Sequence, residues 1–181
     1  MRGSKDLIKP RNGALKPETR MRLFIAVQLD QGLKKAILDA MQDMKAAGVR
    51  GRFVSADNLH LTLAFIGETD RIREIREALQ SVSFEPFEIS ASGTGAFRDL
   101  LWVGLSESRK LTELAERVRG ALDERKIGHD GKRFLAHITI VRDSRGFENQ
   151  ITPPEGKTIV RKISLMRSDV INGKRVYTEL N

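Results

Sequence analysis

The chain has 181 residues, of which 40% are hydrophobic and 31% charged, a composition typical of a globular protein rather than a disordered one. It contains no cysteine, which excludes a disulfide framework, a zinc-thiolate site and a thiol nucleophile. No apolar run approaches the roughly 20 residues of a membrane-spanning helix, and the start lacks a secretory signal, so we expect a cytoplasmic protein with no membrane partner.

The net charge of +8 is unevenly distributed along the chain. Half of it lies in residues 1–20, which show no apolar periodicity and contain Pro10 and Pro17. We interpret residues 1–20 as a disordered leader that derives from expression, and residues 21–181 as one domain. That domain is only mildly basic, which suits an anionic substrate but does not by itself indicate nucleic acid.

Strand-like and helix-like patterns alternate along residues 21–181. The first half predicts a strand over 21–29, a helix between Asp30 and Gly48, an extended piece near Phe53, a strand over 58–67, a helix over 72–82, and strands over 84–91 and 101–105 separated by a turn at Gly93 and Gly95. The second half predicts a helix over 111–122 that is closed near Gly128, a strand over 134–142, and strands over 158–171 and 175–180 joined by a hairpin turn at Asn172-Gly173. This alternation indicates an α+β fold.

Two of the three histidines stand in the same local pattern. His60 and Thr62 are flanked by leucines, and His137 and Thr139 by alanine and isoleucines. Because residues two apart on a strand point to the same side, each histidine shares a face with its threonine while the apolar neighbours face a core. Two readings compete with a functional one: chance placement on solvated strands, and a metal site. Two histidines with no carboxylate or cysteine at ligand spacing are too few for the usual zinc site, so we expect no metal and no cofactor.

The pair of His-x-Thr motifs resembles the two-histidine phosphoesterase superfamily, and within it the RNA 2′,3′-cyclic phosphodiesterases, also called 2′-5′ RNA ligases. The likeness extends to Met21–Val27, to the segment Leu61–Gly67, to Leu101–Gly104, and to Arg142 after the second motif. The family usually has proline before the second histidine, where this chain has Ala136, a change that removes no reactive group. The resemblance implies two pseudo-symmetric lobes of antiparallel sheet, with helices outside, around a central cleft to which each lobe contributes one motif.

The chemistry that the resemblance implies is hydrolysis of a 2′,3′-cyclic phosphate at an RNA end to a 2′-phosphate, with weak reverse 2′-5′ ligation. This reaction needs a base for water and an acid for the leaving oxygen, and histidine can do either near neutral pH. By resemblance, His60 is the general acid and His137 the general base. Thr62 and Thr139 hold the phosphate, because hydroxyls can donate hydrogen bonds to its oxygens.

Other residues carry weaker expectations. The resemblance places Arg142 on the phosphate, although five residues after His137 an ideal strand would turn it to the opposite face. Phe65 and Phe134 could stack on a base or belong to the core, and Trp102 is expected in the core. Loop residue His129 is expected at the surface, and Arg52 and Arg133 could widen a basic rim.

Two other functions use the same cleft and stay open: a nucleotide-binding module, and an enzyme that opens a small cyclic nucleotide such as an ADP-ribose cyclic phosphate. A basic rim with exposed aromatic residues would favour RNA, and a closed pocket would favour the small molecule. We expect a monomer, because no heptad pattern or long exposed apolar helix face is present.

Overall fold

The structure is a computed structural model that describes residues 20–145 and 152–180. Of the leader expected over residues 1–20, all but Arg20 lies outside the described residues. The described chain forms two antiparallel sheets with three α-helices, which confirms the expected α+β class.

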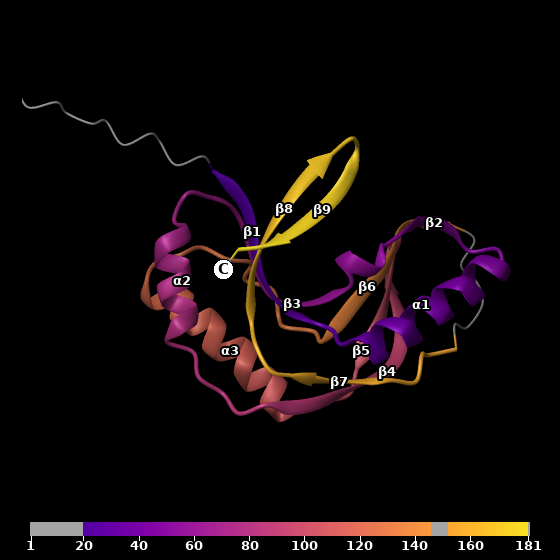
Figure 1. The fold of residues 1–181 in the computed structure, drawn as a ribbon, viewed down its shortest axis with the longest axis horizontal. Coiled ribbons are helices and arrows are strands. Elements are labelled where there is room, and N and C mark those ends of the chain that lie inside the picture. The colour runs from indigo at the N-terminus through magenta and orange to yellow at the C-terminus, as the bar shows by residue number, and fades with distance from the viewer. Residues whose placement is uncertain (1–19, 146–151, 181) are drawn as a thin grey trace, which may run out of the picture.

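The first sheet has four strands in the order β3-β1-β8-β9. Its strands are β1 (Met21–Gln28), β3 (His60–Thr69), β8 (Ser164–Ile171) and β9 (Lys174–Glu179). Helices α2 (Ile72–Gln80) and α3 (Arg109–Glu124) pack against each other, and α3 also packs against β3. We call this sheet and its two helices the first lobe; it occupies the left side of Figure 1.

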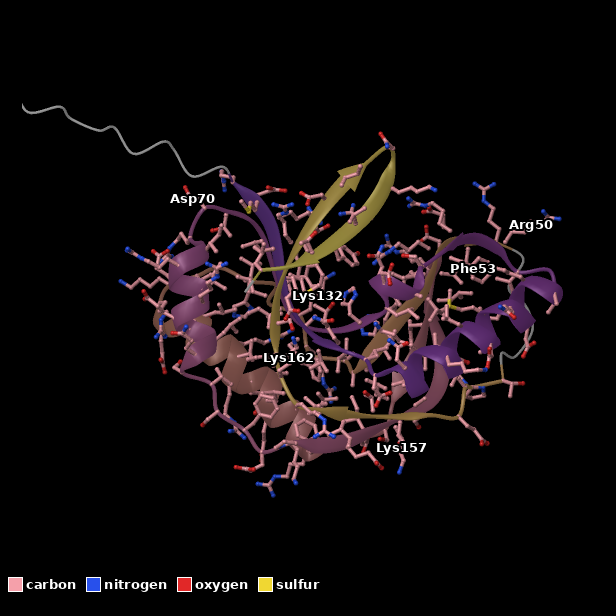
Figure 2. All side chains as sticks on the ribbon, viewed as in Figure 1. Arg50, Phe53, Asp70, Lys132, Lys157 and Lys162 are labelled. Carbon is pink, nitrogen blue, oxygen red and sulfur yellow. The ribbon has the colours of Figure 1, made fainter. Side chains whose placement is uncertain are left out.

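The second sheet has five strands in the order β2-β6-β5-β4-β7. Its strands are β2 (Arg50–Phe53), β4 (Phe87–Phe97), β5 (Leu100–Leu105), β6 (His137–Arg145) and β7 (Lys157–Val160). Helix α1 (Gln31–Ala46) contacts β7, and a short 3-10 helix, η1 (Ala56–Asn58), leads into β3. We call this sheet with α1 the second lobe, and the two lobes lie at opposite ends of the molecule, where Asp70 and Arg50 mark their outer edges (Figure 2).

The lobes are not the two halves of the chain. After β7 completes the second sheet, the chain returns to the first lobe and adds the hairpin of β8 and β9 beside β1 (Figure 1). The segment expected as one strand over 158–171 is therefore two strands, β7 and β8, which belong to different sheets. The expected hairpin turn is confirmed, with positive φ angles of 50° at Asn172 and 73° at Gly173.

One main core connects both lobes. It contains alternate residues of β1, such as Leu23 and Ile25, together with buried side chains of α1, α3, β3 and β6. Asp30 fixes the start of α1, because its carboxylate accepts a hydrogen bond of 3.0 Å from the Leu33 amide, as the sequence predicted. The other face of the first sheet has a small cluster of its own around Phe24. Both faces of β1 are therefore covered, which explains its run of five buried residues.

Several expected boundaries were wrong, among them that of the strand predicted from residue 84, which begins at Phe87. The turn predicted at Gly93 and Gly95 does not exist, because β4 continues to Phe97 and the chain turns at Arg98, whose φ is 54°. A Cβ at Gly95 would lie 2.3 Å from the Trp102 ring, so this glycine marks a close approach of the ring to the strand. The strand predicted from Phe134 begins only at His137.

Candidate active site

The two histidines begin strands β3 and β6, which lie side by side where the lobes meet. Each ring is fixed in the same way by the chain just before it. His60 Nδ1 lies 2.6 Å from the Asn58 carbonyl oxygen, and His137 Nδ1 lies 2.8 Å from the Leu135 carbonyl oxygen. Because a carbonyl only accepts, Nδ1 carries the proton in both rings, and Nε2 of each is left for chemistry.

The threonines lie on the same strand faces as the histidines, as the pattern predicted. Thr62 Oγ1 is 3.1 Å from His60 Nε2. Thr139 is half-buried on β6, opposite Trp102 of β5, and shares the face of His137.

Arg142 reaches the site because β6 contains a bulge. The pairing of β5 with β6 shifts by one residue between Leu101 and Trp102, so that β6 has one more residue than its partner at that point. Ile140 and Val141 are consecutive buried residues for this reason. The extra residue reverses the alternation and turns Arg142 to the face of His137, which an ideal strand would not do.

Strand β3 also contains a bulge after its His-x-Thr motif. Its pairing with β1 shifts between Ile25 and Ala26, and Leu63 and Ala64 are consecutive buried residues. Phe65 therefore shares the face of His60, at the same distance in sequence as Arg142 from His137. The two lobes thus present matching series, a histidine, a threonine and a residue after a bulge, and they differ in that the last residue is an aromatic in one and an arginine in the other.

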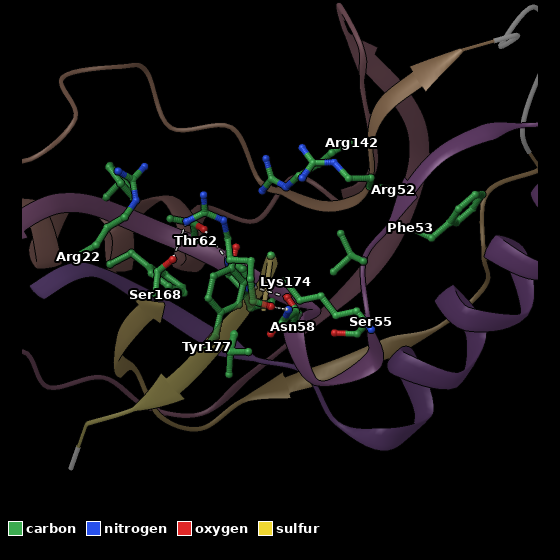
Figure 3. A pocket seen from close by; sticks show the side chains of 17 residues that line it. Arg22, Arg52, Phe53, Ser55, Asn58, Thr62, Arg142, Ser168, Lys174 and Tyr177 are labelled. Atoms are coloured by element: carbon green, nitrogen blue, oxygen red, sulfur yellow. Dashed lines mark hydrogen bonds between the residues drawn. The ribbon is translucent and has the colours of Figure 1, made fainter. Parts of the chain in front are cut away.

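A cleft of about 940 Å³ opens over these strands and the β8–β9 hairpin. Its lining includes His60, Thr62, Phe65 and Arg142, whereas His137, Thr139 and Phe134 are not among the lining residues. Figure 3 shows Arg22 at one end, Arg142 and Arg52 toward the other, and Thr62 with Tyr177 between them. The lining has five basic residues and no carboxylate; the five are Arg22, Arg52, Arg142, Lys174 and Arg175.

Aromatic rings surround both histidines. Phe24 and Tyr177 lie 4.8 and 5.0 Å from His60, and Phe97 and Trp102 lie 5.7 and 6.2 Å from His137, measured between ring centroids. Trp102, expected in the core, is instead half-buried on the His137 face, because its register places it opposite Thr139.

Burial among these rings lowers the pKa of His60 to about 4. The positive charge of Arg142 lowers it further, as does that of His137 when protonated, while the hydrogen bond to the Asn58 carbonyl raises it. His60 is therefore neutral at pH 7 in the ligand-free protein. These charge effects couple His60 of the first lobe electrostatically to Arg142 and His137, which both lie on β6 of the second lobe.

An ion pair connects the first motif to the loop that precedes the second. The Asp130 carboxylate accepts a 2.9 Å hydrogen bond from the Phe65 amide, and the Asp130 amide donates one of 2.8 Å to the Phe65 carbonyl. Arg119 lies 3.7 Å from that carboxylate and donates to the carbonyls of Leu63 and Lys132. The bulge of β3 and the approach to His137 are thus held by the same two side chains.

Of the remaining residues that the sequence singled out, some line the cleft and others do not. Phe65 lies in the cleft, whereas Phe134 packs against the main core, with the Arg119 guanidinium 6.0 Å from its ring centroid. Arg52 lines the cleft and pairs with Asp143; Arg133 is exposed and not part of the lining. His129 is half-buried in its loop and contacts Asp123 at 3.1 Å.

Sequence reasoning missed several cleft residues, notably Arg22, Arg175 and Tyr177. Their strands were predicted, but no local pattern in the sequence says that the Tyr177 side chain of β9 contacts Phe24 of β1 and His60 of β3. Within residues 20–145 and 152–180, no group of three or more His, Cys, Asp or Glu side chains could hold a metal ion. None of the helices described is long and apolar enough to span a membrane.

Two histidines held in one tautomer, with threonines beside them at the junction of two sheets, define a phosphoesterase of the two-histidine class. The family model described as LigT-like phosphoesterase matches residues 27–104. An RNA 2′,3′-cyclic phosphodiesterase from Archaeoglobus fulgidus is 37% identical over 152 residues, which cover 80% of this chain and 81% of that protein. The chain belongs to the LigT-like phosphoesterase family.

Solved structures support the same assignment. The apo form of E. coli LigT superposes with a TM-score of 0.79 at 28% identity, covering 90% of this chain and 96% of that one. The complex of E. coli LigT with 3′-AMP gives a TM-score of 0.78 at 27% identity over the same shares of the two chains.

Proposed function

We propose that the protein hydrolyses 2′,3′-cyclic phosphate ends of RNA to 2′-phosphate ends without a metal. The observation that carries this proposal is the matched pair His60 and His137, each with Nδ1 bonded to a carbonyl and Nε2 left unprotonated. The name of the Archaeoglobus relative supports the substrate, and the basic cleft and the exposed Phe97 (46% exposed) support RNA over a small molecule.

In the proposed reaction, His137 Nε2 takes a proton from water as the water oxygen attacks phosphorus. The bond from phosphorus to the 3′ oxygen breaks, and His60 Nε2 gives its proton to that oxygen. Thr62, Thr139 and Arg142 stabilise the charge that develops on the phosphate oxygens. Phe65 is in a position to stack on the terminal base.

The lowered pKa of His60 adds a condition to the acid role. With a pKa of about 4, the ring has no proton to give at pH 7 until a ligand changes its surroundings. An anionic phosphate beside Nε2 stabilises the imidazolium and offsets the charge of Arg142, so substrate binding itself raises the pKa. His60 thus becomes an acid only in the enzyme–substrate complex.

The test is hydrolysis of a short RNA that ends in a 2′,3′-cyclic phosphate, in EDTA. His60→Ala and His137→Ala should each lower kcat about 10²–10⁴-fold. His129→Gln is the matched control, because it changes the third histidine outside the cleft, and it should retain wild-type turnover. Activity that survives both alanine substitutions, or that requires a metal, would refute the mechanism.

The nucleotide-binding module remains the second candidate, because E. coli LigT was solved with 3′-AMP, ATP and NADP+. Binding of 3′-AMP by the wild type with no turnover of the cyclic RNA would favour it.

We infer that the enzyme acts as a monomer in the cytoplasm, where it would meet cleaved RNA, and that reverse 2′-5′ ligation is weak. The monomer is supported because one chain supplies both motifs and the whole cleft lining. Light scattering during gel filtration tests the monomer, and incubation of the two RNA products tests ligation.

A further inference from the structure

The cleft contains more positive charge than is needed to neutralise a cyclic phosphate. A 2′,3′-cyclic phosphate has one negative charge, whereas five cationic side chains and no carboxylate line the cleft. Arg142 serves the reacting phosphate, and Arg52 is paired with Asp143. Arg22, Lys174 and Arg175 remain, and none of the three has a carboxylate within ion-pair distance among the residues that the structure describes.

Arg22 continues the series of functional groups along the first sheet. Ala26 pairs with Thr62 and Phe24 with Phe65, and Arg22 lies two residues further along β1 on the same face. From Ala26 to Arg22 the strand extends about 13 Å. Catalytic histidine, phosphate-binding threonine, aromatic ring and arginine therefore follow one another along a single surface.

The Arg22 guanidinium lies over the Phe65 ring, with Cζ 4.7 Å from the ring centroid. In the first lobe, Phe65 occupies the position that Arg142 occupies in the second lobe. The first lobe therefore has no arginine of its own at this position on β3, and Arg22 of the neighbouring strand β1 places a guanidinium there instead. Stacking on the ring orients the guanidinium but leaves its N–H donors free for an anion.

The β8–β9 hairpin supplies the facing side of this end of the cleft. Arg175 donates a 2.8 Å hydrogen bond to the Ser168 hydroxyl, and its own carbonyl accepts one of 2.8 Å from Asn58. A neutral hydroxyl fixes the side chain without neutralising it. Arg22 and Arg175 thus both line the cleft beyond His60. Each is held in place, Arg22 over the Phe65 ring and Arg175 at the Ser168 hydroxyl, and Arg22 lies opposite Glu68 in the strand register without forming an ion pair with it.

We propose that Arg22 and Arg175 form a subsite for the phosphodiester on the 5′ side of the terminal nucleotide, so that the enzyme selects RNA chains over cyclic mononucleotides. This inference rests on the proposed function. The cyclic phosphate lies at Thr62, the terminal base lies on Phe65, and the next phosphodiester reaches the two arginines. A cyclic mononucleotide fills the first two positions and leaves the third empty.

The experiment compares kcat/KM for 2′,3′-cyclic AMP with that for an RNA trinucleotide ending in the same cyclic nucleotide. We expect the wild type to prefer the trinucleotide at least tenfold. Arg22→Gln, which retains a planar group over Phe65, should reduce this ratio about tenfold, as should Arg175→Gln. Each should also reduce by about 0.7 the slope of log(kcat/KM) against log salt on the trinucleotide, as expected for one lost phosphate contact on a single strand.

Arg76→Gln is the matched control, because it removes one exposed arginine on α2, outside the cleft lining. It should change neither the ratio nor the slope. Turnover of both substrates at equal efficiency by the wild type, or equal losses on both in Arg22→Gln, would overturn the subsite and leave the proposed function standing. No turnover of either substrate would overturn the proposed function and the subsite with it.

Discussion

His60 and His137 are alike in sequence and in their carbonyl bonds, but they differ in surroundings. His60 is enclosed by Phe24 and Tyr177, and the cationic Arg142 acts on it as well. Burial and charge both oppose protonation, so the ring proposed as the general acid is neutral in the ligand-free protein. The lowered pKa makes the proposed acid role of His60 dependent on the substrate, since a bound anion stabilises the protonated ring and so opposes both effects.

The dependence of the His60 pKa on a bound anion and on Arg142 can be measured directly. In the free protein, NMR titration of labelled histidines should give His60 a pKa of about 4. Saturation with 2′-AMP should raise this pKa because the phosphate stabilises the imidazolium. Arg142→Ala should also raise it, because a repelling positive charge is removed. The chain has three histidines, so the signals can be assigned with one substitution each. A His60 that titrates near 6.5 in the free protein would contradict this account.

Individual residues differed in how far the sequence could identify them. The His-x-Thr pairs were visible because a strand's alternation is local, and two residues apart means the same face. Arg22 and Arg175 were not, because their meeting in the cleft depends on the pairing of β1 with β8, two segments more than 100 residues apart. No local pattern encodes such a pairing.

At the scale of strands, the two bulges determine which side chains face the candidate active site. In both β3 and β6 the extra residue follows the His-x-Thr motif and brings the fifth residue after the histidine back to the active face. Strict alternation predicted the opposite side for Arg142, and the family resemblance alone placed it at the phosphate. A hint was present in the sequence: Leu63-Ala64 and Ile140-Val141 are adjacent apolar pairs, which break the alternation where the bulges occur.

Gly95 shows how one strand supports a proposed catalytic residue on another. The sequence interpretation took this glycine for a turn, yet it lies within β4 and leaves room for the Trp102 ring of β5. Trp102 in turn meets the His137 ring edge-on. A glycine far from the chemistry therefore helps to set the position of the proposed base.

Gly95→Ala should disturb this arrangement. Its Cβ would come within 2.3 Å of the Trp102 ring, so the ring must move. We expect a loss of about 1–3 kcal/mol in the free energy of unfolding by urea, as for other overpacked sites. The emission of Trp102, the single tryptophan, should shift, and kcat should fall with it.

The control for this change is Gly120→Ala, since no heavy atom lies within 4 Å of the Cβ that it would add in α3. It should leave emission and kcat unchanged. Unaltered emission in Gly95→Ala would show that the ring does not depend on this glycine.

For the whole molecule, the sequence and the resemblance predicted the two sheets, but not how the chain is divided between them. A cleft with one motif from each lobe was also expected, and of the two motifs only His60 and Thr62 line the cleft. The lobes interleave, because α1 belongs with the second sheet while β8 and β9 return to the first. Only the pairing of distant strands could reveal this. The consequence is that one core contains buried side chains from both lobes.

A shared core should make the two lobes unfold together. Thermal unfolding should show one cooperative transition, with calorimetric and van't Hoff enthalpies in agreement. Because the proposed phosphate site takes Thr62 from the first lobe and Arg142 from the second, 2′-AMP at 100 times its Kd should stabilise the folded state by about 2.7 kcal/mol. For a chain of this size, that raises the Tm by roughly 5–10 °C. Arg142→Ala should show a smaller rise at the same concentration, since it weakens binding from the second lobe. Two separate transitions, with the ligand shifting only one of them, would mean that the lobes are independent and that the cleft lies between two folding units rather than within one.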